Sequence, residues 1–193
     1  MTQSVNRPAD HAHVGNRGGA GFACHTGLVL DFGAGTGRDA IGVLARDVLG
    51  LTFTSSVEAM GAAVELATKQ GLIALDETVF INDLLDIPQP PQLRTTYDAM
   101  DNSTRDAGRR MAIPRLIERA SRVQPRVLAV EDLHWADRST LAQLAVLTTT
   151  AASCPVLLVM TSRLEHEALD QAWRAETGAS PLSVIELAPL HDR

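Results

Sequence analysis

Residues 127–137 read VLAVEDLHWAD, a short apolar run that ends in two adjacent acids, Glu131 and Asp132. A run of this kind is typical of a buried strand in a parallel sheet. In open α/β sheets, ligands bind just beyond the carboxyl ends of the strands, where the two acids would lie. Carboxylates there can hold Mg²⁺ through water and orient an attacking water, as phosphoryl transfer requires. The bare pair is equally compatible with a solvated turn.

Strand and helix patterns alternate through most of the chain. Residues 1–20 hold almost no apolar side chains and are expected to form a disordered tail, so the folded domain would span residues 21–193. Apolar runs and helical spacing predict strands at 26–32, 126–130, 156–161 and 183–187, and helices at 39–51, 57–67, 138–152 and 165–177. This alternation predicts an α/β fold with a parallel sheet flanked by helices.

Two residues carry more local predictions. Pro114 lies inside the helical pattern of residues 103–123, which predicts two helices or one kinked helix. Asp137 precedes the helix predicted at 138–152, and its carboxylate is suited to cap the first turn. We therefore expect Asp137 to act as a helix cap rather than as a ligand.

The composition excludes some classes of protein. Lys and Arg number 17 against 23 Asp and Glu, a net charge of −6, which disfavours direct binding to nucleic acid. Cys24 and Cys154 are isolated and predict reduced thiols. No apolar run approaches the ~20 residues of a membrane span, and no secretory signal pattern opens the chain. We expect a cytoplasmic protein without a membrane partner.

A second motif, VLDFGAGTG at residues 29–37, predicts different chemistry. A strand that runs into spaced glycines lets a ligand approach the backbone closely. This segment resembles the first motif of S-adenosylmethionine-dependent methyltransferases, which would use Asp31 and the glycines from Gly33 to Gly37. Such enzymes need an acid about 20 residues on for the ribose hydroxyls, but Thr54 or Ser55 stands there. A methyltransferase therefore stays an alternative interpretation of this segment. The other interpretation is that the glycines only form a tight turn between strand and helix.

Taken whole, residues 127–137 resemble the Walker B region of STAND-type signalling ATPases, an AAA-like class of P-loop NTPases. These modules occur in large multidomain regulators and beside class III adenylate or guanylate cyclase domains. The resemblance extends in the same order over roughly residues 21–190, and it includes segments 20–40, 97–101, Arg109-Arg110, 154–163 and Trp173-Arg174. It implies a P-loop NTPase-like fold and a role in signal transduction.

The resemblance assigns roles to particular residues. Glu131 would help to hold Mg²⁺ through water, and Asp132 would polarise the water that attacks ATP. Arg163, in the sensor-like segment 161–163, would contact the γ-phosphate; its other interpretation is a surface cation. His134 and Trp135 would position the acids, with Trp135 buried. Mg²⁺ and ATP are thus the implied ligands.

The chain departs from this family at the phosphate loop. A Gly-x-x-x-x-Gly-Lys-Ser/Thr sequence is missing from all 193 residues, and residues 1–20 contain no lysine. In the family, a strand and this loop stand before the segment that matches residues 21–40, and that strand lies between the sensor strand and the final strand. We therefore expect an incomplete module that hydrolyses ATP weakly or not at all. It would be a truncated remnant, the product of a misplaced start, or a piece that associates with another chain.

An incomplete sheet would also expose strand edges. Unpaired edges can recruit a protein partner or lead to self-association. A third interpretation is therefore a non-catalytic interaction fragment.

Overall fold

The computed structural model describes four segments of the protein, residues 21–29, 40–163, 169–178 and 180–188. Within them one sheet holds three parallel strands in the order β1 (Ala23–Leu28), β2 (Arg126–Glu131) and β3 (Val156–Met160). The predicted α/β fold with a parallel sheet flanked by helices is confirmed. The predicted tail at 1–20 and the glycines from Gly33 to Gly37 lie outside the described residues.

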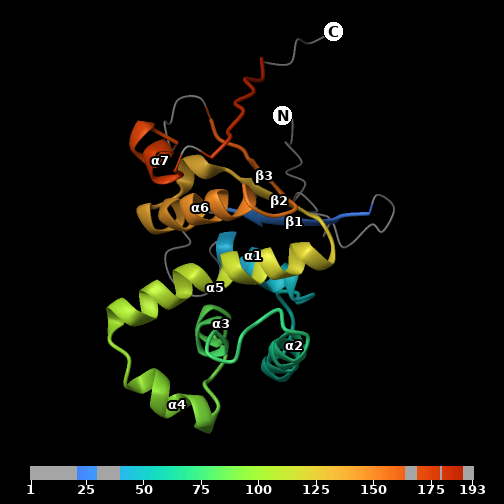
Figure 1. Ribbon diagram of the computed structural model, residues 1–193, viewed down its shortest axis with the longest axis vertical. Coiled ribbons are helices and arrows are strands. Elements are labelled where there is room, and N and C mark those ends of the chain that lie inside the picture. The colour runs from blue at the N-terminus through green and yellow to red at the C-terminus, as the bar shows by residue number, and fades with distance from the viewer. Residues whose placement is uncertain (1–20, 30–39, 164–168, 179, 189–193) are drawn as a thin grey trace, which may run out of the picture.

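Helices fill most of the remaining described chain (Figure 1). They are α1 (Ala40–Val48), α2 (Val57–Lys69), α3 (Thr78–Leu84), α4 (Pro91–Asp98), α5 (Asn102–Val123), α6 (Arg138–Ala151), α7 (Gln171–Glu176) and the short 3₁₀ helix η1 (Leu133–Trp135). Helix α1 packs on β1 and α6 on β3, while α5 packs on α6 and on α3. In Figure 1, α2, α3 and α4 form a group on the far side of α5 from the sheet.

The described helices cover only one face of the sheet. Residues in register across parallel strands point to the same side, and His25, Leu128 and Leu158 form one such row, buried or half-buried against the helices. The next row is Thr26, Ala129 and Val159, and two of its three members are exposed. Parallel sheets usually have both faces covered. No described helix covers the other face, which Cys24, Thr26, Leu28, Val127, Ala129, Leu157 and Val159 form and on which Thr26, Leu157 and Val159 are exposed; we call it the open face.

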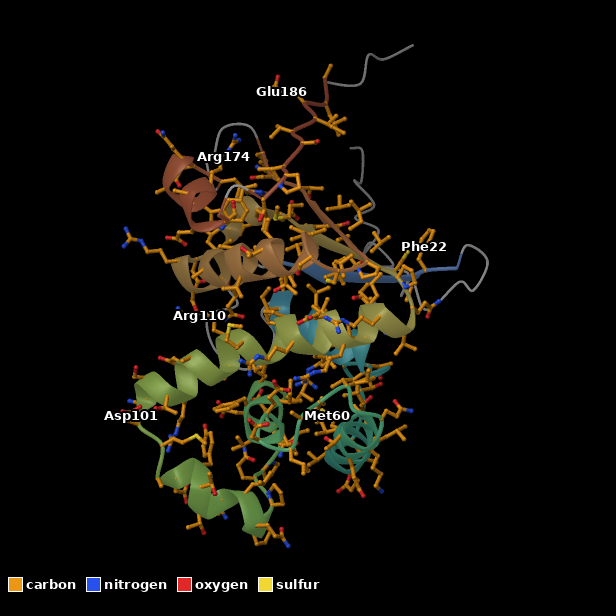
Figure 2. The ribbon with its side chains drawn as sticks, in the orientation of Figure 1. Phe22, Met60, Asp101, Arg110, Arg174 and Glu186 are labelled. Atoms are coloured by element: carbon orange, nitrogen blue, oxygen red, sulfur yellow. The ribbon has the colours of Figure 1, made fainter. Side chains whose placement is uncertain are left out.

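Helix α5 connects the sheet layer to the outer helices. It is one continuous helix with Pro114 inside it, so of the two predicted alternatives, two helices or one kinked helix, the structure has a single helix. Proline removes one backbone donor, but Ile113, Leu116 and Ile117 are fully buried around it and hold the helix in place. Figure 2 shows the side chains gathered between α5 and the outer helices, with Met60 of α2 among them.

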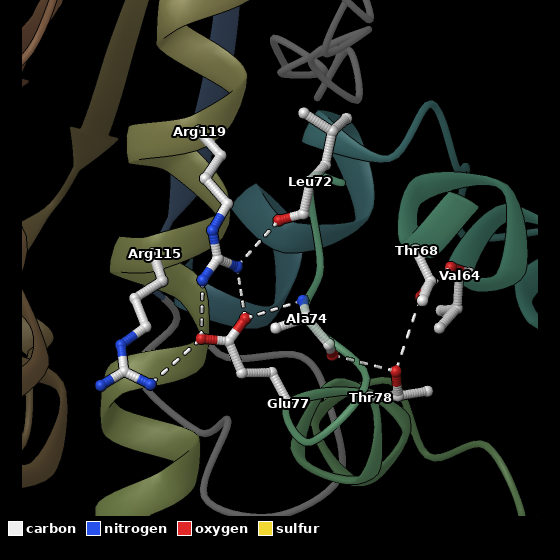
Figure 3. A network of polar contacts seen from close by, with 8 residues as sticks. All are labelled: Val64, Thr68, Leu72, Ala74, Glu77, Thr78, Arg115 and Arg119. Carbon is white, nitrogen blue, oxygen red and sulfur yellow. Dashed lines mark hydrogen bonds and ion pairs between the residues drawn. The ribbon is translucent and has the colours of Figure 1, made fainter. Parts of the chain in front are cut away.

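A buried carboxylate joins α3 to α5. Glu77 accepts hydrogen bonds from Arg115 at 3.0 Å, from the backbone N–H of Ala74 at 3.0 Å, and from both terminal nitrogens of Arg119, the longer at 3.1 Å (Figure 3). Burial alone would raise the pKa of Glu77, but these donors outweigh it and lower the pKa below its usual range. The network fixes the outer helices against α5.

The strand predicted at 183–187 is absent. Residues 180–188 are described and contain no helix or strand. A short apolar segment forms a strand only when a neighbouring strand satisfies its backbone, and no described strand pairs with this one. The helix predicted at 165–177 is described only in part, as α7, and none of the described helices is long and apolar enough to cross a membrane.

Candidate functional site

The two predicted acids lie at the carboxyl end of the central strand. Glu131 is the last residue of β2, and Asp132 follows it directly. Both side chains reach solvent, and that of Asp132 is 52% exposed. The structure therefore places both carboxylates where a ligand at the edge of the sheet can reach them.

The backbone at Asp132 adopts a left-handed conformation, with φ 61° and ψ 42°. This region is uncommon for residues other than glycine, although aspartate tolerates it better than most. The N–H of Asp132 donates to the Thr161 hydroxyl at 3.3 Å, and the N–H of Leu133 donates to the Thr161 carbonyl at 2.9 Å. The turn after β2 is thus held in this conformation by the residue that follows β3.

The contacts of Thr161 with the end of β2 and with the turn beyond it were not predicted from the sequence. Its N–H donates to the Val130 carbonyl at 3.0 Å, so it binds both the end of β2 and the turn beyond it. Such a role depends on the register between β2 and β3, and no local pattern in the sequence encodes that register. The structure therefore joins the segment that contains Glu131 and Asp132 to the segment that ends in Arg163.

Arg163 lies two residues after Thr161 and is exposed. Because β2 and β3 are parallel and in register, with Val130 opposite Met160, Arg163 and the two acids follow strand ends at the same edge of the sheet. An exposed guanidinium at this edge can take part in charge-assisted hydrogen bonds with an anion.

The short helix η1 turns the chain away from the acids. The side chain of His134 is 2% exposed, with its Nδ1 3.9 Å from an Asp132 carboxylate oxygen, and its ring centroid lies 4.9 Å from that of Trp135. Trp135 itself is 44% exposed, so the prediction of a buried tryptophan is wrong. In a 3₁₀ helix successive side chains point in different directions, and Leu133 takes the inward position instead.

The capping prediction for Asp137 is confirmed. Its carboxylate accepts the N–H of Thr140 at 2.7 Å, at the start of α6. This bond satisfies one of the free amides of the first turn. Asp137 is therefore engaged in helix capping.

A second polar cluster lies near the opposite end of the sheet. His25 of β1 is buried, with Nδ1 2.9 Å from Asp47 of α1 and Nε2 2.6 Å from the guanidinium of Arg126. A nitrogen that accepts from arginine carries no proton, so Nδ1 is the atom that donates to Asp47. Burial lowers the pKa of Arg126, and the nearby Asp47 opposes that shift. The cluster ties β1, β2 and α1 together and is structural.

Of the motif that resembles methyltransferases, residues 29–37, the structure describes only Val29. Val29 donates its N–H to the Glu131 carbonyl at 3.0 Å, whereas Asp31 and the glycines of residues 33–37 lie outside the described residues. In the described order, five helices separate β1 from β2. Thr54 and Ser55 stand just before α2, whose cap is Ser56, and not at a strand end. The strand end that would carry a ribose-binding acid is therefore not found at that place.

Metal ligation by the protein alone has little support in the described segments. They hold no group of three or more His, Cys, Asp or Glu side chains placed to bind one ion. Mg²⁺, however, keeps several waters and commonly takes only one or two carboxylates together with phosphate oxygens. The exposed pair Glu131 and Asp132 fits that water-mediated role.

Comparison with known proteins gives no relative: no protein-family model, curated protein or solved structure matches the chain.

Proposed function

We propose that this chain is an ATP-binding signalling module of the STAND type, with Glu131 and Asp132 at the Mg²⁺ and water positions and Arg163 toward the γ-phosphate. The proposal rests on one observation above all. Thr161 holds the backbone of Asp132 and Leu133, so the two segments that resemble Walker B and sensor regions meet at one edge of the sheet. The order β1-β2-β3, with β3 outermost among the described strands, also agrees with the family order, where a further strand follows the sensor strand.

The chemistry of such a site is divided between ion and protein. When bound, Mg²⁺ would neutralise phosphate charge and hold water. Glu131 would orient a water of that ion, Asp132 would accept a hydrogen bond from the attacking water, and Arg163 would donate to phosphate oxygens. The chain has no phosphate-loop lysine to add its charge. Because positioning and charge neutralisation carry most of this catalysis, the proposal is for binding with weak or absent hydrolysis.

Calorimetric titration of the purified chain with Mg-ATP tests the proposal. We expect saturable binding that weakens in Glu131→Ala and in Arg163→Ala. Glu65→Ala and Arg122→Ala are matched controls, because both residues are exposed on helices away from this edge and should leave binding unchanged. S-adenosylmethionine is the parallel ligand. Binding of this methyl donor that is lost in Asp31→Ala would replace the proposal with the methyltransferase alternative.

A second candidate function is a non-catalytic interaction module. The observation in its favour is the outer edge of β3, which pairs with no described strand, together with the open face of the sheet. An unpaired strand edge offers backbone donors and acceptors to a strand from another chain.

A further inference from the structure

The outer edge of β3 has backbone groups that pair with no described strand. The Pro155 carbonyl accepts from Arg126 and the Thr161 N–H donates to Val130, so odd-numbered residues of this strand turn their backbone toward β2. Because backbone groups alternate along a strand, those of Leu158 and Met160 face away from β2. Among the described residues no strand pairs with this side. The edge can therefore accept another strand.

Nothing in the sequence of β3 protects this edge. Natural edge strands carry lysine, proline or charged side chains that discourage pairing, whereas β3 reads VLLVM. On the open face, Leu157 is 59% exposed and Val159 41% exposed. Apolar, β-branched and uncharged residues of this kind favour strand addition.

The same chain exposes an unpaired apolar segment. Residues 181–188 are exposed throughout, and Val184, Ile185 and Leu187 are 63%, 81% and 83% exposed. The segment follows α7, which is fixed to α6 by the buried Trp173 through a 2.8 Å bond from its indole N–H to the Leu141 carbonyl. In Figure 2, Glu186 lies far out on this segment, beyond the folded layers.

We propose that residues 183–187 of one copy add as a fourth strand to the free β3 edge of a second copy, and that the two copies exchange these segments reciprocally. The proposal rests on the second function above, an edge that recruits a strand, and adds which strand it recruits. Ile185 and Leu187 alternate with Glu186, so in a strand they share one side and can lie beside Leu157 and Val159 of the partner. Within one chain the segment is exposed and does not pair with β3, whereas two copies around a two-fold axis would bury both surfaces.

Sedimentation velocity of the full chain over a range of concentrations tests this exchange. We expect a monomer–dimer equilibrium, strengthened by salt because each copy carries a net charge of −6. Ile185→Pro removes a strand donor from the segment, and Leu157→Lys places a charge on the acceptor edge. Each should raise the dimer dissociation constant about tenfold or more, since both change central contacts of the interface. Leu75→Asp is the matched control, because Leu75 is 79% exposed away from both surfaces.

Mixing the two variants makes the test specific. One Ile185→Pro copy and one Leu157→Lys copy retain one intact segment and one intact edge between them, so a mixture should form a 1:1 dimer at concentrations where each variant alone is mainly monomeric. Circular dichroism should show both variants folded, as expected for exposed positions. A wild-type chain that stays monomeric would overturn both the exchange and the recruiting edge. A dimer weakened by Leu157→Lys but not by Ile185→Pro would support association through the β3 edge and would contradict the proposal that residues 183–187 supply the added strand.

Discussion

At Asp132 a single residue combines a left-handed backbone with an exposed carboxylate at the end of the central strand. Two hydrogen bonds to Thr161 hold that backbone in place. Residues in sparsely populated conformations cluster at functional sites, where surrounding contacts keep them. The backbone of Asp132 is thus a second reason, independent of sequence resemblance, to look for ligand chemistry at this edge.

The effect of a substitution at Asp132 on the free energy of unfolding should depend on how easily the new residue adopts positive φ. Asp132→Gly should leave the free energy of unfolding nearly unchanged, because glycine accepts positive φ without strain. Asp132→Val should lower it by about 1–3 kcal/mol, because a β-branched residue is strained there. Chemical denaturation measures both. Asp76→Val, at an exposed residue without positive φ, is the control, and equal stability of the Gly and Val variants would contradict the left-handed turn.

At the scale of elements, the contact between α1 and β1 depends on the absence of a side chain. A Cβ added at Gly27 would lie 2.6 Å from the Ala40 carbonyl oxygen, a backbone atom that cannot move aside cheaply. Gly27→Ala should therefore lower the free energy of unfolding by about 1–3 kcal/mol. Gly61→Ala, in α2 with open space around it, should raise it by roughly 0.5–1 kcal/mol. Thermal unfolding distinguishes the two variants. If both changed the melting temperature in the same direction, the close contact between Gly27 and α1 would be contradicted.

The Glu77 network predicts how stability depends on pH. The folded-state pKa of Glu77 is lowered, so its stabilisation is fully present above the unfolded pKa of 4.5 and is lost as pH falls below that value. Glu77→Gln should cost roughly 1–3 kcal/mol near neutral pH, because it removes the charge of a buried carboxylate from its ion pairs with Arg115 and Arg119, whose partly exposed guanidinium groups solvent screens in part. Urea denaturation should show that the difference in free energy of unfolding between wild type and variant becomes smaller in acid. A gap that stays constant would mean that Glu77 is not ionised in the folded protein.

Elements with strong local signals were predictable. The apolar runs of β2 and β3 and the cap at Asp137 appear where the sequence indicates them. The predicted strand at 183–187 fails because a strand depends on a partner that its own residues do not specify. The prediction that Trp135 is buried is wrong for a related reason, because Leu133 takes the inward place in a 3₁₀ turn. In the site, the position of the two acids followed from the strand pattern, whereas the role of Thr161 required the register of the sheet.

At the scale of the whole molecule, the described helices cover one face of a three-stranded sheet and leave the open face uncovered, and no described strand pairs with the outer edge of β3. The candidate site and the edge proposed to recruit a strand meet at β3, because Thr161 and Arg163 follow the strand whose outer side pairs with no described strand. A partner strand on β3 would thus lie beside the segment proposed to contact the γ-phosphate. Nucleotide binding and association are therefore expected to influence each other.

The fluorescence of Trp135 tests nucleotide binding at this site most directly. Trp135 is half-exposed three residues from Asp132, whereas Trp173, the other tryptophan, is buried under α6 contacts. Titration with Mg-ATP should give a saturable change in emission that disappears in Trp135→Phe and weakens in Glu131→Ala but not in Glu65→Ala. A response that stays flat to millimolar Mg-ATP, or a saturable change that survives Trp135→Phe, would contradict a nucleotide site at the end of β2.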